Sequence, residues 1–297
     1  MRLCTYLSRR DPSLGSRVGI LEDEGVTQVN GIATMLEALS APRIGSIERG
    51  RRVKESDVRL CAPIQRPGKI VAAIVNTAGM LGGEDVTLER PRMDMKAPST
   101  VIGPQRVVFA PRSGVRPEVE LAVVVGKRSV RLSKKGAEEA IFGYTILNDV
   151  TAPLDSKEDA YDAYRRDKTT GLIRKVTMRG PLFRSKNHDT FCPMGPCLVT
   201  KDELDVADLG MRTEFLGRKV QEGNTSEYIF SPRELVSYVS GFLSLDPGDV
   251  VSCGSVGWTR EAIGDYDPTE YLLPKKNGTM KLSVDGLGVL TNPLRYQ

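Results

Sequence analysis

The sequence has one histidine, His188, and one tryptophan, Trp258, among its 297 residues. A single histidine excludes any metal site that needs two histidines, such as the HExxH type. A Ser-His-Asp or Cys-His catalytic device would have to use His188. A GxSxG elbow, a P-loop and a GxGxxG fingerprint are also lacking. The sequence therefore argues against the commonest serine hydrolase, nucleotide-binding and zinc-hydrolase sites.

Cysteine is sparse and its spacing is uninformative. The five cysteines include no CxxC pair, and they are Cys4, Cys61, Cys192, Cys197 and Cys253. An odd count without such a pair argues against a disulfide framework or a structural zinc site, and it favours a reducing cytoplasm. Cys253 lies in a glycine-containing loop, where a reactive thiol is one interpretation and a small buried residue is the commoner one.

The sequence lacks both a strong charge bias and a long apolar run. Its 42 basic and 38 acidic residues give a net charge of +4, an excess too small and too scattered to predict a nucleic-acid partner. No apolar run is long enough to span a bilayer. The first ten residues become charged before a signal-peptide core could form. We therefore expect a cytoplasmic protein that binds neither nucleic acid nor membranes.

A pair of acids within an apolar run is the most informative feature that is present. Glu118 and Glu120 lie in residues 116–126, where Val, Leu and Ala predict a buried strand. Side chains two apart on a strand point the same way, so both carboxylates emerge on one face, where a cation would offset their repulsion and desolvation. A second apolar run, 143–149, ends in Asp149. Three carboxylates without nearby His or Cys suit Mg²⁺, Mn²⁺ or Ca²⁺ better than zinc.

The periodicity predicts a small unit at residues 1–62 and a larger one at 67–297. In the first, residues 16–30 predict a strand, a turn and a strand, and 32–40 predict a short helix. In the second, strands are expected at 69–75, 106–110, 120–126, 143–148, 195–200, 212–216, 249–252 and 280–284. Helices are expected at 134–142 and from Ser231, where Pro232 and Glu234 complete a capping box before the apolar stripe Leu235, Val239 and Phe242.

The charged stretch 157–184 is the least core-like part of the chain. One interpretation is a solvated helix and loop. The alternative is a mobile flap near the site, since long excursions from a compact domain are often functional.

Six blocks along residues 67–297 resemble the motifs of one enzyme family in the same order. Residues 95–104 contain Lys-Ala-Pro-Ser before Gly-Pro, 118–126 contain Glu-x-Glu, 143–152 contain Gly-Tyr and Asn-Asp, 186–196 contain Asp-Thr-Phe and Gly-Pro, and 221–225 and 245–250 also fit. By these motifs the chain resembles the fumarylacetoacetate hydrolase family.

The resemblance implies an α+β, mainly β fold, with a mixed β-roll C-terminal domain, a small N-terminal β domain and a homodimer. It also implies a divalent metal on Glu118, Glu120 and Asp149. Members act on 2-oxo or 1,3-diketo acids, and they cleave C–C bonds by hydrolysis, decarboxylate, hydrate or isomerise. A metal held by three carboxylates keeps open positions, and it would stabilise the enolate of such a small-molecule oxo acid.

The same resemblance suggests roles for other residues. Lys186 would add a positive charge beside the enolate or the substrate carboxylate, with a surface salt bridge as the alternative. Lys96 is either a substrate-binding residue at the site edge or part of a structural ion pair. Gly254 and Ser255 lie in a loop that resembles the family's carboxylate-holding segment, so substrate binding is expected of both. Trp258 either walls the pocket or packs in the core.

The sequence departs from the family pattern at the residues that activate water. Family hydrolases usually carry Asn-Tyr-x-x-His-x-x-Glu, whose His and Glu act together. Here Thr77, Met80 and Gly83 stand at the Tyr, His and Glu positions, and methionine cannot take a proton. Glu84, one residue late, is a candidate replacement. So is His188, which shares a face with the site lysine if that segment is extended; a structural histidine is the alternative.

Three functions remain open from the sequence. C–C bond hydrolysis is the general expectation for the family. Decarboxylation or keto–enol isomerisation needs less water activation and suits the missing dyad better. A non-catalytic homologue that binds metal and ligand is the third, although clustered like charges have no use in an idle site.

Overall fold

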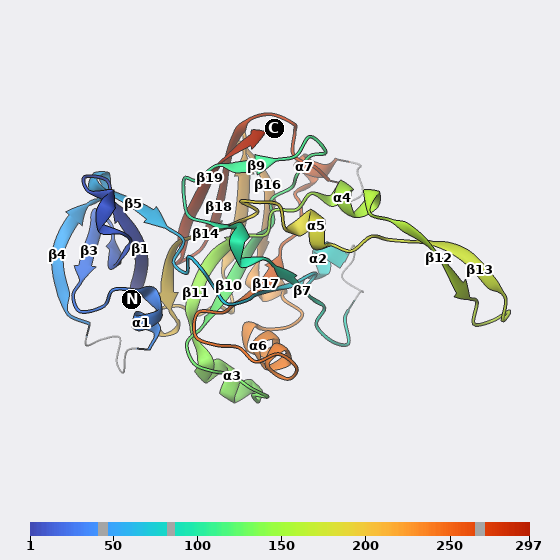
Figure 1. Cartoon of the computed structure of the whole chain (residues 1–297), viewed down its shortest axis with the longest axis horizontal. Coiled ribbons are helices and arrows are strands. Elements are labelled where there is room, and N and C mark those ends of the chain that lie inside the picture. The colour runs from blue at the N-terminus through green and yellow to red at the C-terminus, as the bar shows by residue number, and fades with distance from the viewer. Residues whose placement is uncertain (41–46, 82–86, 265–270) are drawn as a thin grey trace.

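The computed structural model describes residues 1–40, 47–81, 87–264 and 271–297. Strands dominate this part of the chain and the helices are short, which confirms the predicted α+β, mainly β class. Figure 1 shows two sheets packed together in the body and a hairpin that projects from one end. None of the helices in the described part is both long enough and apolar enough to cross a membrane.

Four neighbouring strands form the centre of the larger sheet. They are β14 (Cys192–Thr200), β11 (Ile141–Asn148), β10 (Val119–Val125) and β17 (Val250–Ser255), paired in that order. Every residue of β10, β14 and β17 is buried, which explains why these segments are mainly apolar rather than alternating. All five cysteines are buried and free, which agrees with the commoner interpretation of Cys253.

Two further strands extend this sheet beyond β17. They are β6 (Ile70–Ala73) and β7 (Met93–Lys96). β6 runs parallel to β17 and pairs Ala72 with Ser252, whereas β7 runs antiparallel to β6 and pairs Asp94 with Ala72. Residues from three distant parts of the sequence therefore lie in one row across the sheet.

The N-terminal strands continue the opposite side of the same sheet. They are β1 (Arg2–Ser8), β2 (Arg17–Glu22), β3 (Gly25–Val29), β4 (Arg49–Lys54) and β5 (Val58–Cys61). The expected hairpin at 16–30 is confirmed by the β2–β3 pairing, and helix α1 (Met35–Leu39) by its place within 32–40. β1, which the sequence analysis missed, pairs with β14. The division at residues 1–62 and 67–297 stays a prediction.

A second sheet packs against the first. Its order is β16 (Arg218–Asn224), β15 (Gly210–Phe215), β18 (Gly278–Val284), β19 (Gly288–Tyr296) and β9 (Val108–Ala110). Leu121 and Ile146 of the first sheet belong to one buried cluster with Met211, Met280 and Leu282 of the second. This shared core fixes β10 and β11, which carry the predicted acids at their ends.

Helices α3 (Lys134–Ala140) and α6 (Pro232–Ser240) pack against each other below the sheets in Figure 1. The capping box at the start of α6 is confirmed, since the N–H of Ser231 donates to the Glu234 carboxylate at 2.9 Å. The apolar stripe is buried except at Phe242, which follows the end of the helix and is 66% exposed. Placing Phe242 in the stripe was wrong, because the helix ends two residues earlier.

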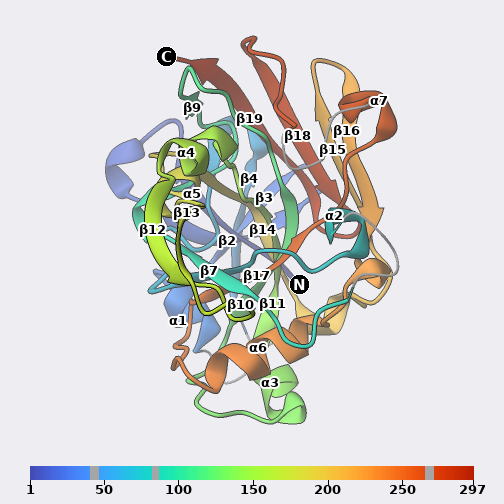
Figure 2. The same cartoon turned by 90° about the vertical axis from the view of Figure 1, so that its right-hand side faces the viewer.

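The charged stretch 157–184 forms a projecting hairpin rather than the expected solvated helix and loop. Its elements are α4 (Pro153–Glu158), β12 (Tyr161–Arg166), β13 (Ile173–Met178) and α5 (Phe183–Lys186). Among the described residues, β12 and β13 pair with each other and with no other strand. Figure 1 shows them leaving the body, and Figure 2, which faces this end of the molecule, shows α4 and α5 beside them. Arg184 links α5 to the end of α4 through ion pairs with Asp159 at 2.8 Å and Glu158 at 3.0 Å.

The basic excess of the chain is concentrated in the hairpin. Residues 161–180 contain six basic and two acidic side chains, so they carry +4, and the other 277 residues contain 36 of each sign. Describing the basic excess as scattered was therefore wrong.

Candidate metal centre

Glu118, Glu120 and Asp149 converge in the core. One oxygen from each carboxylate lies within 4.8 Å of the others, and all three residues are buried. Glu118 precedes β10, Glu120 lies within it, and Asp149 follows the neighbouring β11, where its N–H donates to the carbonyl of Glu118 at 2.9 Å. The strand period of two and the antiparallel pairing thus bring the carboxylates together.

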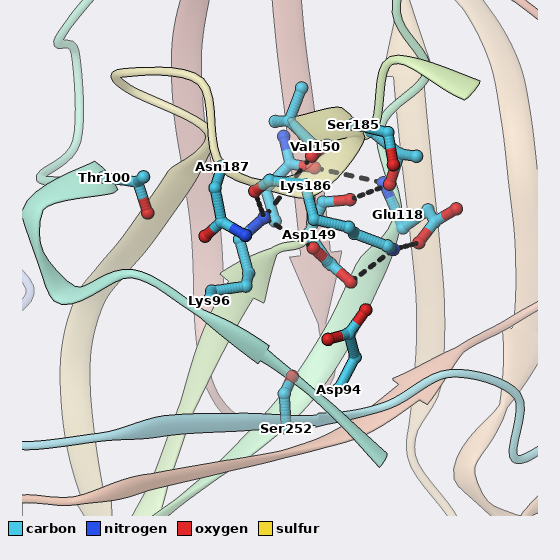
Figure 3. Close-up of polar contacts among 12 residues, drawn as sticks. Asp94, Lys96, Thr100, Glu118, Asp149, Val150, Ser185, Lys186, Asn187 and Ser252 are labelled. Atoms are coloured by element: carbon cyan, nitrogen blue, oxygen red, sulfur yellow. Dashed lines mark hydrogen bonds and ion pairs between the residues drawn. The ribbon is translucent and has the colours of Figure 1, made fainter. Parts of the chain in front are cut away.

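Lys186 supplies positive charge inside this cluster. Its ammonium donates to Glu118 Oε2 at 2.7 Å and to Asp149 Oδ2 at 2.6 Å (Figure 3). Burial alone would lower the pKa of Lys186, but the carboxylates of Asp149 and Glu118 raise it above its ordinary value. Arg116 completes the neutralisation of Glu118, with Nε 2.9 Å from Oε1.

Lys96 lies behind Asp149 and is only 1% exposed. Its ammonium is 2.7 Å from Asp149 Oδ1 and donates to the backbone carbonyl of Lys186 at 2.6 Å. Burial would raise the pKa of Asp149, but the neighbouring Lys186 and Lys96 hold it below its ordinary value. These contacts favour the structural interpretation of Lys96 over the substrate-binding one.

Glu120 has no lysine in contact and is held by neutral donors instead. Its Oε2 accepts from Ser252 Oγ at 2.5 Å and from the N–H of Gly254 at 3.1 Å. Burial, reinforced by the charge of Asp149, raises the pKa of Glu120 to about 8. A Cβ at Gly254, where φ is +93°, would lie 2.8 Å from the Cβ of Asn76, so this close approach requires glycine.

We expect Glu120 to make the metal-free protein less stable as pH rises. A folded pKa of about 8 lies above the ordinary value of 4.5, so the folded chain keeps a proton that the unfolded chain releases in this interval. Unfolding is therefore favoured progressively between about pH 5 and 8. Melting of EDTA-treated protein across this range checks the effect, with Glu120→Gln as the reference. Equal pH dependence in both proteins would refute it.

The loop expected to bind substrate through Gly254 and Ser255 is occupied by internal contacts. The N–H of Gly254 donates to Glu120 Oε2, and Ser255 Oγ accepts from Gln221 Nε2 at 2.9 Å. Gln221 also accepts from the N–H of Val119 and so ties this loop to β10. The sequence analysis missed this role of Gln221, although the residue begins one of the quoted blocks.

Trp258 lies beside this loop and is partly buried. Its ring packs on Tyr271 with centroids 4.6 Å apart, and the Arg116 guanidinium lies 5.8 Å from its centroid. Arg116 also forms an ion pair with Glu118, so it links the indole ring to the carboxylate cluster. Its role as a pocket wall stays a prediction.

Of the two expected replacements for the missing base, His188 lies in the described chain and does not join the cluster. His188 Nε2 is 2.5 Å from Asp155 Oδ2, and its ring packs on Phe191. Lys186 ends helix α5 instead of lying on a strand, so a shared strand face with His188 was wrong. Glu84 and Gly83 lie outside the described residues. Met80 lies in helix α2 (Ala78–Leu81).

Asp94 faces the cluster and was missed by the sequence analysis. It is partly buried on β7, two residues before Lys96, and Figure 3 shows its carboxylate directed toward Lys186 and Asp149. The available signal was the spacing of Asp94 and Lys96, which places both side chains on one strand face.

The donor set fits a hard divalent cation. Three carboxylates present oxygen ligands at one point, and the Lys186 ammonium between two of them shows that positive charge is stabilised there. Glu118, Glu120 and Asp149 are the residues that would hold Mg²⁺, Mn²⁺ or Ca²⁺.

Comparisons with known proteins identify the family of the chain. The family model described as fumarylacetoacetate (FAA) hydrolase C-terminal matches residues 69–295. The chain is 31% identical to the 2,4-didehydro-3-deoxy-L-rhamnonate hydrolase of Sphingomonas sp. strain SKA58, over 97% of this chain and 94% of that protein. It is 33% identical to the oxaloacetate tautomerase YisK of Bacillus subtilis, over 80% of this chain and 74% of that protein.

A solved structure shows the same fold. The 5-carboxymethyl-2-hydroxymuconate delta-isomerase from Mycobacterium smegmatis matches with a TM-score of 0.75 at 29% identity, and both chains are covered in full.

Proposed function

Because this chain belongs to the fumarylacetoacetate hydrolase family, we propose that it is a divalent-cation-dependent enzyme that interconverts the keto and enol forms of a 2-oxo acid. The observation that carries this proposal is the buried cluster of Glu118, Glu120 and Asp149 with the ammonium of Lys186 between two of them. Such a cluster can hold charge that develops on a substrate oxygen, while Met80 stands where family hydrolases place the histidine that activates water.

The residues of the site have separate roles in this reaction. Glu118, Glu120 and Asp149 would hold the cation, which supplies Lewis-acid polarisation of the keto oxygen when bound. Lys186 places a fixed positive charge where negative charge grows as the substrate enolises. Lys96 and Arg116 orient Asp149 and Glu118 through ion pairs, and the buried strands around them limit the access of water.

Isomerisation is favoured over hydrolysis because it requires no activated water. Met80 has no basic atom, and His188 is engaged by Asp155. A related chain of Bacillus subtilis is named an oxaloacetate tautomerase, and a similar solved structure is named a delta-isomerase. Both names describe an isomerisation.

C–C bond hydrolysis of a 2-oxo or 1,3-diketo acid is the second candidate. The relative that aligns with 97% of this chain is named a hydrolase of a diketo sugar acid. Hydrolysis would require a base from elsewhere, and Glu84 is the candidate that the sequence supplies.

The test measures three reactions in parallel with purified protein and Mg²⁺ or Mn²⁺. These are ketonisation of enol-oxaloacetate, followed by ultraviolet absorbance, release of pyruvate and CO₂ from oxaloacetate, and cleavage of acylpyruvates. We expect ketonisation to be fastest, and to be lost in a Glu118→Gln, Glu120→Gln variant but kept in the exposed control Glu222→Gln. Fast acylpyruvate cleavage would favour hydrolysis instead. Cation binding without any turnover would favour the non-catalytic homologue.

If the missing dyad limits hydrolysis, a Met80→His, Gly83→Glu variant should gain acylpyruvate cleavage. No gain would mean that the lost dyad is not the limiting feature.

A further inference from the structure

A row of residues across three strands defines one side of the site. Ser252 on β17 pairs with Ala72 on β6, and Ala72 pairs with Asp94 on β7. Directly paired residues point to the same face of a sheet. Ser252 Oγ donates to Glu120, so this face is the one that carries the carboxylates. Asp94 therefore lies on the site face by register alone, in agreement with Figure 3.

The row sets the distance between Asp94 and the residue that contacts Glu120. Neighbouring strands lie about 4.8 Å apart, so Asp94 and Ser252 are separated by about 10 Å between their backbones. The residue between them is Ala72, whose side chain is a single methyl group. Ser252, which contacts Glu120, lies at one end of this row, and Asp94 lies at the other.

The Asp94 carboxylate is available for chemistry. It is partly buried, whereas Lys96 two residues later is 1% exposed. Its Oδ1 accepts only the local N–H of Met95, at 2.7 Å, and within the described ranges no ion pair includes Asp94. By contrast, the carboxylates of Glu118 and Asp149 are each in contact with Lys186.

We infer that Asp94 is the proton-transfer residue of this site, acting on the carbon next to the keto group of a 2-oxo acid. This inference rests on the proposed function. The C3–H bond of the substrate breaks, its proton moves to the Asp94 carboxylate, and its electron pair forms the C2–C3 double bond as the keto oxygen takes the negative charge. Return of the proton to that oxygen gives the enol, and return to C3 restores the keto form.

Other residues in contact with the cluster are less suited to this step. Glu118, Glu120 and Asp149 are needed for the cation, and the Lys186 ammonium is in contact with two of these carboxylates. Figure 3 shows the Asp94 carboxylate directed toward Lys186, so Asp94 is placed to act on a carbon whose oxygen faces Lys186.

The test measures exchange of the methyl protons of pyruvate with D₂O by ¹H NMR, with Mg²⁺ present. We expect Asp94→Asn to slow exchange by about 10² to 10⁴, Asp94→Glu to recover part of the rate, and the exposed control Asp162→Asn to match wild type. The pH–rate profile of Asp94→Asn should lose the limb that reports ionisation of the base. Calorimetric titration with Mg²⁺ should give the same affinity in wild type and Asp94→Asn, because Asp94 is not assigned as a ligand.

Other results separate this inference from the proposed function. Wild-type exchange in Asp94→Asn overturns the inference and leaves the proposed function intact. A lower Mg²⁺ affinity in Asp94→Asn also overturns it, because Asp94 would then be a fourth ligand. Absence of both exchange and turnover in the wild type overturns the proposed function itself. If Asp94→Asn melts early, the rate of Asp94→Glu decides: a rate below wild type in a variant with wild-type Tm supports the inference, and an undiminished rate overturns it.

Discussion

Lys186→Met is expected to abolish turnover and to make the stability of the protein depend on the divalent cation. The substitution removes the ammonium that lies 2.7 Å from Glu118 and 2.6 Å from Asp149, and it leaves two buried carboxylates short of a positive charge. Breaking a buried pair in this way costs about 3–5 kcal/mol of folding stability. The loss of a fixed charge facing a developing oxyanion should lower kcat by about 10²-fold to 10³-fold.

The cation offers a specific check on this prediction. A divalent ion bound by the three carboxylates would compensate for the missing ammonium, so Mg²⁺ or Mn²⁺ should raise the Tm of Lys186→Met more than that of wild type. Lys175→Met is the matched control, because Lys175 is exposed on the hairpin and should leave activity and Tm unchanged. Equal responses of the two variants to the cation would contradict the assignment of Lys186.

Asp149→Asn is expected to be far more damaging to the fold than Glu120→Gln, although both remove a predicted ligand. Asp149 contacts two buried ammonium groups, Lys96 at Oδ1 and Lys186 at Oδ2. An asparagine would turn an NH₂ group toward one of them, so a loss of about 3–5 kcal/mol and a Tm lower by about 10 °C follow.

Glu120 is in a different position because burial raises its pKa to about 8, so its carboxyl is largely neutral near pH 7 in the absence of a cation. The carbonyl oxygen of glutamine can accept the same bonds from Ser252 and Gly254. Glu120→Gln should therefore fold with nearly wild-type Tm and bind Mn²⁺ at least tenfold more weakly.

Thermal melting with EDTA and Mn²⁺ titration by calorimetry measure both parts of this contrast. Equal destabilisation by the two substitutions would show that the charges of Asp149 and Glu120 are balanced differently from the contacts described above.

The centre of the fold was predictable because its signals are local. The runs that form β10 and β11 are mainly apolar, and a strand period of two was enough to place Glu118 and Glu120 together. The capping box at Ser231 and Glu234 needed only four residues of sequence. Asp149 was found because an acid directly follows an apolar run.

What the sequence did not reveal depends on pairing between distant segments. The place of Asp94 follows from the row through Ala72 to Ser252, which joins strands about 160 residues apart in the chain. Lys96 is buried because its ammonium ends at Asp149 and the carbonyl of Lys186, neither of which is near it in sequence. The homodimer, the cytoplasmic location and the absence of nucleic-acid and membrane partners stay predictions.

The hairpin at 161–180 has a consequence for handling the protein. Since it carries the whole excess of +4, a chain in which the hairpin is replaced by a short uncharged turn would have 36 residues of each sign. Such a molecule would be isoelectric near neutral pH, where weak mutual repulsion favours precipitation. The hairpin therefore supplies the net charge that helps to keep the protein in solution. A variant with a shortened hairpin would need compensating charge elsewhere on its surface.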